Sequence, residues 1–543
     1  MGHLSSPRPP RFWLLPLLAA PVLVHAWEPP VHPVQAQRAL QGDPRLKSDA
    51  LVAPADADLA AFRAWLDVRF RAHPDPKLRD AYVRRAGEAG LTPALLKALL
   101  GVQAGRRVAG VDDARDAAGT APEIVALGAG QPDLDQRHQD VLATDATGKP
   151  LVLPDGRPVP GDPLQANLGA ATGRVSQRWA HDGFADVPVS ADPELLKADG
   201  RRHAVALGWP AGPVKGFVRE NVQAHYDLAV LAALWGGRAL SLQFFGQALH
   251  FLCDAGDPVN GVQVGARDLF QAARLYTWER SLGTAGGFLG ELRPLDESML
   301  ALAWTHRQLA DALTARRVAD SLAGKELPES ARALVPALTV DDGEFRKDIE
   351  MAVAQALGRM GKKPYVPAAG VVASRLVDVA SRDGAEVLRH ALGASAPRLH
   401  VPTASYDPAA EDPDAALGDV GQPDVKAHLD SLYWLQARAF SRVGTAVRLV
   451  HSRYQGDVAA AEDAVREERA AAFAEAWLAA RVAALEAREA RVAAFVKDPP
   501  PAPAAVHSLA WLLIPPLLLL ALVAAVVALL RRRVTAEEPA AAP

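Results

Sequence analysis

The chain has 543 residues, of which 50% are hydrophobic and 22% are charged, so it has ample material for a buried core and is not an intrinsically disordered chain. Its formal net charge of −4 is small for this length and excludes an overall basic field that would attract nucleic acid over a distance. The single cysteine, Cys253, excludes an internal disulfide, so a fold outside the cytoplasm must rest on core packing, on metal, or on both. We expect Cys253 itself to be a small buried residue.

The N-terminal segment has the pattern of a secretory signal peptide. Two arginines precede an apolar run over residues 12–24, and a small-apolar sequence follows, directly before Trp27. An uncleaved anchor is the alternative, but a run of about 13 residues is too short to span roughly 30 Å of hydrocarbon as a helix. We therefore predict that residues 1–26 are removed and that the mature chain begins at Trp27.

The chain that follows the predicted signal peptide has the periodicity of an all-α protein. Apolar residues recur at three- and four-residue spacing, while alternating strand-like runs are scarce and short. The clearest helical patterns cover residues 59–72, 222–236, 240–253, 266–280, 298–322, 345–360 and 425–450.

Two stretches interrupt this helical pattern. Residues 128–186 are rich in Gly, Pro and Asp, which predicts a long irregular excursion between helices. Irregular segments of that length inside a compact domain are usually functional, so the Asp and His residues that it carries are candidate site residues. Residues 395–423 are again rich in Pro and Asp, and they predict a loop or a domain boundary.

The C-terminal part predicts a membrane anchor. Residues 457–497 are dense in strong helix formers and predict a stalk helix, which a Pro-rich spacer extends to residue 507. Residues 508–530 carry no charge and are long enough to cross a bilayer as one transmembrane helix. Three arginines follow immediately, and positive charge beside a spanning helix stays in the cytoplasm. We therefore expect an exported, single-pass membrane protein with its N-terminal ectodomain outside and a short C-terminal tail inside.

The predicted organisation has six parts. They are a signal peptide at 1–26, a helical domain at 27–365, a helical extension of unknown role at 366–456, the stalk helix and spacer at 457–507, the transmembrane helix at 508–530 and the cytoplasmic tail at 531–543.

A candidate metal-binding pair lies at the end of the helix predicted at 240–253. His250 and Asp254 are four residues apart, so their side chains project from one face of a helix and can bind one metal ion. A His and an Asp at this spacing are also common as a surface pair. Here His250-Phe-Leu-Cys-Asp254 is followed by three residues and Pro258, after an Ala- and Leu-containing stretch from Gly246. This segment resembles the central motif of zinc-dependent phospholipase C and of the single-strand-specific zinc nucleases.

Further residues match what this superfamily uses. Its mature N-terminal tryptophan binds zinc through the free amine and the backbone carbonyl, and its nucleases have a histidine five residues later. Trp27 and His32 match both features. An aspartate after a Gly-rich turn and a histidine ahead of the central helix are matched by Asp133 and His181, both within the irregular excursion. Two nearby residues are rivals for these positions, namely Asp135 and His138.

The resemblance implies an all-α fold, a helical bundle around a multinuclear zinc site. One zinc would be bound by Asp133, His181, His250 and Asp254, and a second by Trp27, His32 and Asp254. Asp254 would thus bridge the two ions. Imidazole nitrogen, carboxylate oxygen and a free amine all suit zinc, and open coordination positions leave room for water.

The same superfamily binds a third zinc, and here the match fails. The histidine six residues after the bridging aspartate is replaced by Asn260, and of the later ligand pair only Glu279 has a suitable side chain. Asn is a poor zinc ligand, so we expect this site to be empty, weak, or rebuilt with a residue such as Asp257. The resemblance extends from Trp27 to about Arg280.

The chemistry implied by the resemblance is phosphodiester hydrolysis. Zinc ions that share a carboxylate can lower the pKa of a bridging water and offset charge on a phosphoryl oxygen. The first hypothesis is a phospholipase C-like hydrolase that acts on phospholipid headgroups, with Asp133 as general base beside the metal. The second is a single-strand nuclease of the same superfamily, against which the small net charge counts. The third is a zinc-stabilised, non-catalytic ectodomain that lost its third zinc site, for which Asn260 is the support.

Overall fold

The computed structural model describes residues 31–41, 58–101, 119–135, 218–260, 295–360, 368–400, 406–459 apart from residue 409, and 463–499, together with short pieces between 143 and 161 and residues 522–523. The predicted signal peptide, the helix predicted at 266–280 and all but two residues of the predicted transmembrane helix lie outside this part of the chain. Within it, no helix combines the length and the apolar composition that a membrane span needs.

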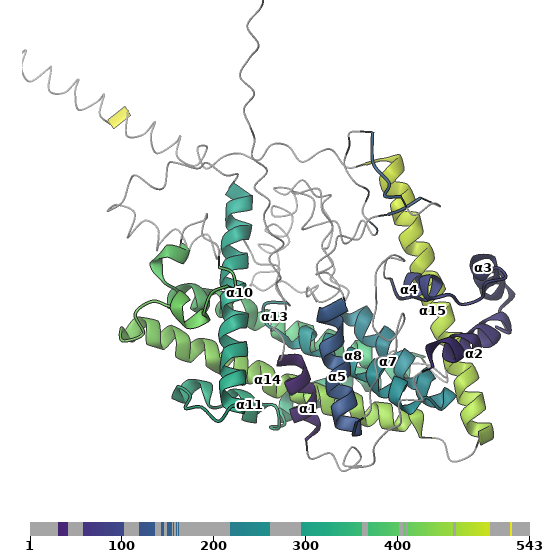
Figure 1. Cartoon of the computed structure of the whole chain (residues 1–543), viewed down its shortest axis with the longest axis horizontal. Helices are drawn as coiled ribbons and strands as arrows, with labels where there is room; N and C mark the ends of the chain where they lie inside the picture. The colour runs from purple at the N-terminus through teal and green to yellow at the C-terminus, as the bar shows by residue number, and fades with distance from the viewer. Residues whose placement is uncertain are drawn as a thin grey trace, which may run out of the picture.

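Apart from isolated bridges, the described residues form helices and no strand, which confirms the predicted all-α class (Figure 1). The α-helices are α1 (Val31–Leu40), α2 (Leu59–Arg71), α3 (Pro76–Ala86), α4 (Pro93–Leu100), α5 (Ala121–Asp135), α7 (Val218–Trp235), α8 (Arg238–Gly256), α10 (Leu295–Leu322), α11 (Leu334–Ala337), α12 (Gly343–Met360), α13 (Ala368–Ala394), α14 (Pro423–Val458) and α15 (Asp463–Lys497). Short 3-10 helices are η4 (Glu329–Ala331), η5 (Pro397–His400) and η6 (Pro413–Ala416).

The centre of the fold is the hairpin of α7 and α8. The two helices are joined at Gly236, whose φ of 105° is in the left-handed region that favours glycine. Every residue of α8 after Arg238 is buried, which is the pattern of a helix surrounded on all sides. The helices that pack around α8 are α7, α5, α13, α1 and α14 (Figure 1).

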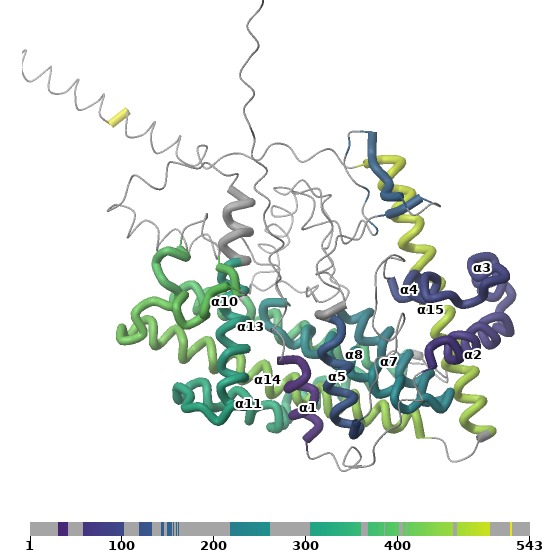
Figure 2. The backbone as a smooth tube through the Cα atoms, viewed as in Figure 1, coloured from purple at the N-terminus to yellow at the C-terminus, as the bar shows by residue number. Residues whose placement is uncertain are grey.

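The predicted extension at 366–456 contributes α13 and α14, which pack against α7 and α8. The approach is close at Gly256, where a Cβ atom would lie only 2.2 Å from Cγ2 of Val443 on α14. At the other end of the chain, α1 packs against α5, α8 and α14 (Figure 2). Helices from the first and last parts of the described chain therefore share one hydrophobic core.

The helix predicted in the stalk segment is present as α15, and it packs on the domain instead of standing apart from it. α15 lies against α2, α3, α4 and α7. Trp477 of α15 is fully buried and stacks on Phe70 of α2, with ring centroids 5.6 Å apart and ring planes 7° apart. Arg85 of α3 pairs with Glu489 of α15 at 2.8 Å. Because a buried aromatic pair removes a large apolar area from water, α15 is part of the core.

The helices α2, α3 and α4 begin at capping side chains. Asp58 accepts hydrogen bonds from two backbone N–H groups of α2, Asp75 accepts one from α3, and Thr92 accepts one from α4. Proline also stands in the first turn of α3 and α4, where its missing N–H costs nothing. These caps explain why the short helices α3 and α4 form, although apolar periodicity alone did not predict them.

The structure corrects the prediction for the start of the Gly-rich stretch. An irregular excursion is predicted from Gly128 onward, but α5 continues as a helix to Asp135. The glycine permits a close crossing of α5 and α8: a Cβ atom on Gly128 would lie 2.4 Å from the Gln243 carbonyl oxygen. Gly246 faces it from α8, since a Cβ atom there would come within 2.8 Å of the Gly128 Cα. The two backbones meet where neither carries a side chain.

Candidate metal centre

Three of the predicted ligands come together at one point of the fold. His32 lies in the first turn of α1, while His250 and Asp254 lie one turn apart on α8. Their ligand atoms all lie within 4.8 Å of one another, and each of the three residues is fully buried. We call these three residues the metal centre, because they could hold a metal ion.

The two histidines face the two oxygens of one carboxylate. His32 Nε2 lies 3.3 Å from Asp254 Oδ1, and His250 Nε2 lies 3.1 Å from Asp254 Oδ2. The imidazole rings stand edge to face, with centroids 4.3 Å apart and an interplanar angle of 62°. Asp254 therefore has the position of a carboxylate that can bind one cation or bridge two.

A carbonyl oxygen sets the orientation of each imidazole ring. His250 Nδ1 is 2.8 Å from the Ala129 carbonyl oxygen, and His32 Nδ1 is 3.2 Å from the Gln35 side-chain oxygen. A carbonyl oxygen can only accept, so each Nδ1 carries the proton and donates it. In a neutral imidazole this leaves a lone pair on Nε2, directed at the Asp254 carboxylate. A cation placed between the two groups would be attracted by both, and this pattern of outer hydrogen bonds is typical of histidines that bind metal.

The crossing of α5 and α8 supplies one of these carbonyl oxygens. Ala129 follows Gly128 directly, and the close approach of the backbones at Gly128 and Gly246 brings the Ala129 carbonyl to the ring of His250. The glycines that predict a loop in the sequence thus serve the metal centre through helix packing.

The position that breaks the superfamily pattern lies at the same centre. Asn260 is fully buried beyond the end of α8, and its side-chain N–H₂ group donates to Asp254 Oδ1 across 3.4 Å. A hydrogen bond to a carboxylate oxygen stabilises its charged form and directs its second lone pair. Asn260 therefore orients the shared carboxylate.

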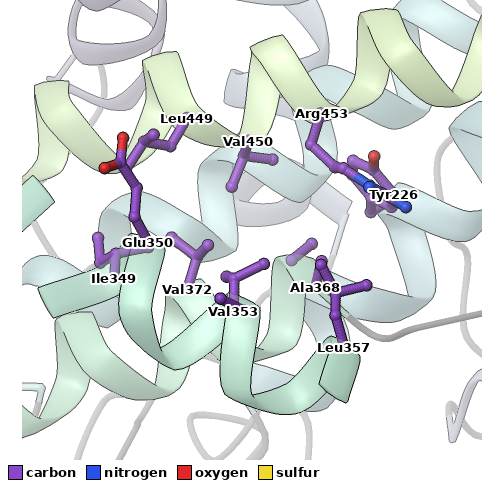
Figure 3. Close-up of a pocket in the computed structure, with 12 residues that line it drawn as sticks. Tyr226, Ile349, Glu350, Val353, Leu357, Ala368, Val372, Leu449, Val450 and Arg453 are labelled. Atoms are coloured by element: carbon purple, nitrogen blue, oxygen red, sulfur yellow. The ribbon is translucent and has the colours of Figure 1, made fainter. Parts of the chain in front are cut away.

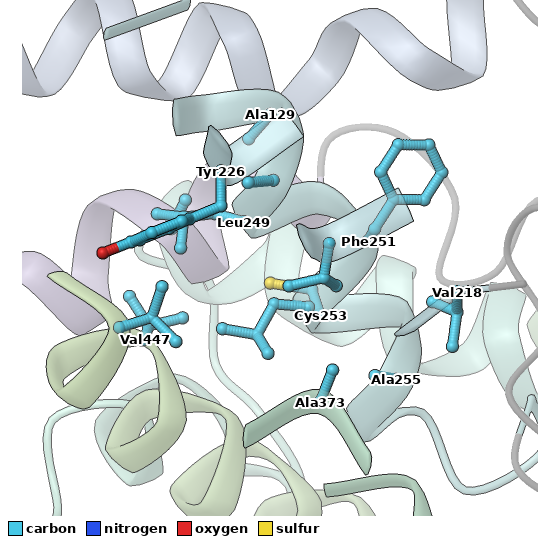
Figure 4. Close-up of a cluster of buried hydrophobic side chains, with 14 of the residues drawn as sticks. Ala129, Val218, Tyr226, Leu249, Phe251, Cys253, Ala255, Ala373 and Val447 are labelled. Carbon is cyan, nitrogen blue, oxygen red and sulfur yellow. The ribbon is translucent and has the colours of Figure 1, made fainter. Parts of the chain in front are cut away.

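Apolar side chains lie around the centre. Cys253 precedes Asp254 and is fully buried among side chains that include Leu249 and Phe251 (Figure 4). Burial raises the pKa of the Cys253 thiol, although the neighbouring His32 opposes the shift. The thiol is therefore neutral at physiological pH, as expected for a small buried residue.

His225 on α7 is a buried histidine beside the centre that the sequence did not single out. Its Nδ1 donates to the Asn221 carbonyl oxygen at 2.9 Å, and its ring lies 5.0 Å from that of Phe251. Burial lowers the pKa of His225 to about 4; the Asn221 carbonyl opposes this shift, and the nearby His250 adds to it. A histidine inside an otherwise apolar helix was the available signal, but such residues are more often part of a core.

The remaining predicted ligands stay predictions. Trp27, His181 and Glu279 lie outside it. Asp133 lies in the last turn of α5, four residues beyond Ala129, so its backbone belongs to the helix that contacts His250.

A separate apolar pocket of about 200 Å³ lies between α7, α12, α13 and α14 (Figure 3). Val353, Leu357, Val372 and Val450 are among its lining residues, and Arg453 stands at one side. None of the residues of the metal centre lines it. The pocket is therefore a feature of the helix packing at another place in the fold.

These observations define a helical protein with a buried His₂Asp cluster that could hold a metal ion. Comparison of the chain with protein-family models, with curated proteins and with solved structures finds no match.

Proposed function

We propose that the protein is a membrane-anchored, extracytoplasmic, zinc-dependent phosphodiester hydrolase of the phospholipase C type, which acts on phospholipid headgroups. The observation that carries the proposal is the convergence of two imidazole Nε2 atoms on the two oxygens of Asp254. Imidazole and carboxylate ligands suit zinc, and a site with few protein ligands keeps positions for water and substrate.

Zinc supplies Lewis acidity to such a site, which activates water and offsets charge on a phosphoryl oxygen. The residues of the chain bind the zinc and orient the ligands that hold it. Ala129 and Gln35 fix the two rings, Asn260 directs the carboxylate, and the apolar surroundings strengthen each electrostatic contact. In this proposal Trp27 and His181 complete the ligand set, and Asp133 accepts the proton of the attacking water.

The predicted anchor at 508–530 supports a lipid substrate. A catalytic domain tethered beside a bilayer meets phospholipid at a high effective concentration. The small net charge gives no comparable advantage for a nucleic-acid substrate.

The test is headgroup release from phosphatidylcholine vesicles by the full chain, with zinc content measured on the same samples. We expect Asp254→Asn to lower both zinc content and release, the latter by about 100-fold or more, because the shared ligand is lost. The matched control is Asp80→Asn on the exposed face of α3, which should change neither quantity. Normal release by the Asp254 variant would contradict the proposal.

A non-catalytic, zinc-stabilised ectodomain is the second candidate, favoured by the contact of Asn260 with Asp254. An amide at that position completes the hydrogen bonding of the carboxylate without binding zinc well. Wild-type protein that holds zinc but hydrolyses neither phosphatidylcholine nor single-stranded DNA would support this candidate. Cleavage of DNA alone would point to the nuclease.

A further inference from the structure

Two histidines face each other at a second place in the fold, between α13 and α14. His390 lies four residues before the end of α13, and His428 lies near the start of α14. Their Nδ1 atoms are 2.9 Å apart, and their ring centroids are 5.2 Å apart at an interplanar angle of 55°. Both residues are half-buried, so the pair can be reached from solvent.

Helix packing holds the two rings together. Gly393 lies three residues after His390 on α13, and a Cβ atom built on it would collide with the His428 ring. The absence of a side chain at Gly393 therefore lets the His428 ring lie against the backbone of α13. Because α13 and α14 pack against each other, a ligand that binds both rings meets groups that are already in place.

Neighbouring charges set the protonation of the pair. The Arg389 guanidinium lies 3.2 Å from His390 Nε2 and can only donate, so His390 has its proton on Nδ1 and donates it to His428 Nδ1. Burial lowers the pKa of both histidines, and the charge of Arg389 lowers it further. A nearby carboxylate opposes each shift, namely Glu386 and Asp424. Both rings are therefore neutral at physiological pH, which is the form that binds metal.

The separation of the two nitrogen atoms matches adjacent positions on one metal ion. Metal–imidazole bonds are about 2.0–2.1 Å long, so nitrogen atoms 2.9 Å apart subtend about 90° at the ion. This is the angle between neighbouring ligands in the square-planar or tetragonal geometry of Cu²⁺, whereas tetrahedral zinc needs a separation of about 3.3 Å.

An outer partner for the bound form is also in place. Glu386 lies one turn before His390 on α13, and its Oε2 atom is 3.7 Å from His390 Nε2. When His390 Nδ1 binds a metal ion, its proton moves to Nε2, which then faces this carboxylate. A carboxylate behind the second ring nitrogen is a common arrangement for histidines that bind metal.

We propose that His390 and His428 form a metal site that binds Cu²⁺ between α13 and α14, with water in the remaining coordination positions. The ion would replace the hydrogen bond between the two rings by two metal–nitrogen bonds. Since the two histidines are 38 positions apart in the sequence, the ion would close a chain loop and stabilise the contact of the two helices. The site depends neither on the metal centre nor on hydrolysis.

Cu²⁺ is the probe, because its electron paramagnetic resonance spectrum reports the nitrogen atoms bound to it. Zinc-loaded full-length protein is titrated with Cu²⁺, and zinc content is measured on the same samples. We expect the first equivalent of Cu²⁺ to bind with two nitrogen ligands while zinc content stays unchanged. His428→Gln keeps an acceptor for the His390 proton but removes one ring, so it should weaken Cu²⁺ binding about tenfold or more.

Two further variants complete the titration. His390→Gln removes the other ring and should have the same effect as His428→Gln. Lys426→Gln is the matched control, because it introduces the same side chain at an exposed position of α14 and leaves both rings intact. Its affinity for Cu²⁺ should be close to that of wild type.

Thermal unfolding gives a second readout. Added Cu²⁺ should raise the unfolding temperature of wild type and of Lys426→Gln, and it should not raise that of His428→Gln. Zn²⁺ at the same concentration should have a smaller effect on wild type, because the two rings must move apart to bind it.

Three results would overturn the copper site. They are the absence of Cu²⁺ binding by wild type, equal Cu²⁺ affinity in wild type and His428→Gln, and release of zinc in proportion to the Cu²⁺ bound, which would place the ion at the other centre. None of these readouts involves headgroup release. The copper site and the proposed hydrolase can therefore fail separately.

Discussion

Each imidazole ring of the metal centre is oriented by a carbonyl oxygen that accepts a hydrogen bond from its Nδ1 atom. The sequence predicted the residue types and the convergence of His32, His250 and Asp254, because two of them lie at helical spacing and the third matches a superfamily position. It could not predict the Ala129 contact, which exists only when α5 crosses α8. The rest of the predicted ligand set is untested by the described residues and stays a prediction.

Gln35 is the outer residue that can be tested most cleanly. It lies one turn after His32 on α1, is fully buried and accepts the Nδ1 proton of that ring. Gln35→Leu keeps the volume and removes the acceptor, so we expect zinc affinity to fall about 10- to 100-fold with folding retained. Zinc affinity is measured by competition with a chelator. Gln41→Leu, at the exposed end of α1, is the matched control, and equal affinities in both variants would contradict the role of Gln35.

His225 makes stability depend on pH. Its pKa is about 4 in the folded protein and 6.5 in the unfolded chain, so between these values the unfolded chain binds more protons. The free energy of unfolding therefore falls as the pH drops below 6.5, and the loss is complete near pH 4. From pH 7 to pH 5 this residue should account for about 2 kcal/mol.

The measurement is urea unfolding of metal-free protein at the two pH values, which keeps metal release out of the comparison. His225→Gln should lose less stability than wild type over the same interval. Identical losses in the two proteins would show that His225 is not the group that titrates.

At the scale of helices, periodicity located the long elements and missed those that depend on caps or on close crossings. The helix predicted at 222–236 begins four residues earlier in the structure, at Val218, and the one predicted at 425–450 extends to Val458. α3 and α4 are short and begin at the capping residues Asp75 and Thr92, which are local signals that apolar periodicity does not reveal.

α5 was missed for a different physical reason. Glycine is compatible with a turn and also with a helix whose backbone packs closely against a second helix. The local sequence around Gly128 does not show which helix will pack there. Gly246 on α8 provides that contact. The residues from Gly128 to Asp135, which are predicted to be irregular from their composition, are therefore helical in the folded protein.

The crossing predicts the effect of a single methyl group. Gly128→Ala would place a Cβ atom 2.4 Å from the Gln243 carbonyl oxygen, so α5 and α8 must separate. We expect the free energy of unfolding to fall by about 2–3 kcal/mol. Zinc affinity should fall too, because the Ala129 carbonyl moves away from His250. Both are measured on the full chain by urea unfolding and chelator competition.

Gly358→Ala is the matched control for this substitution. Gly358 is also inside a helix, α12, but nothing lies within 4 Å of a Cβ atom built there. Alanine should stabilise this position by up to about 1 kcal/mol through its helix propensity. Equal effects of the two substitutions would contradict the proposed crossing.

At the scale of the whole molecule, one core joins segments that the sequence divided into a domain, an extension and a stalk. α13, α14 and α15 all contribute side chains to the cluster that also contains α1 and α8. Composition predicted a helix at 457–497. It could not show whether one face of this helix would pack against other helices, because Ala-rich helices occur both as isolated helices and as packed ones. Trp477 and the small residues around it are the feature that favours packing.

Trp477 tests whether α15 belongs to the core. Trp477→Ala removes a fully buried ring stacked on Phe70, and we expect the free energy of unfolding to fall by about 4 kcal/mol. Trp434 on α14 is the control, since it is 59% exposed and its replacement by Ala should cost less than about 1 kcal/mol. Urea unfolding of the full chain compares them. Similar small losses in both variants would mean that α15 is detached in solution.

The burial of His32 has a consequence for the rate at which metal enters and leaves. All three residues of the centre are inaccessible to solvent, so an ion cannot be exchanged through the folded structure without an opening motion. The shortest helix that carries a ligand is α1, with ten residues. Exchange then proceeds at the rate at which α1 separates from α5, α8 and α14, whatever the concentration of the chelator. We therefore expect metal release to be slow and to reach the same limiting rate at every high chelator concentration.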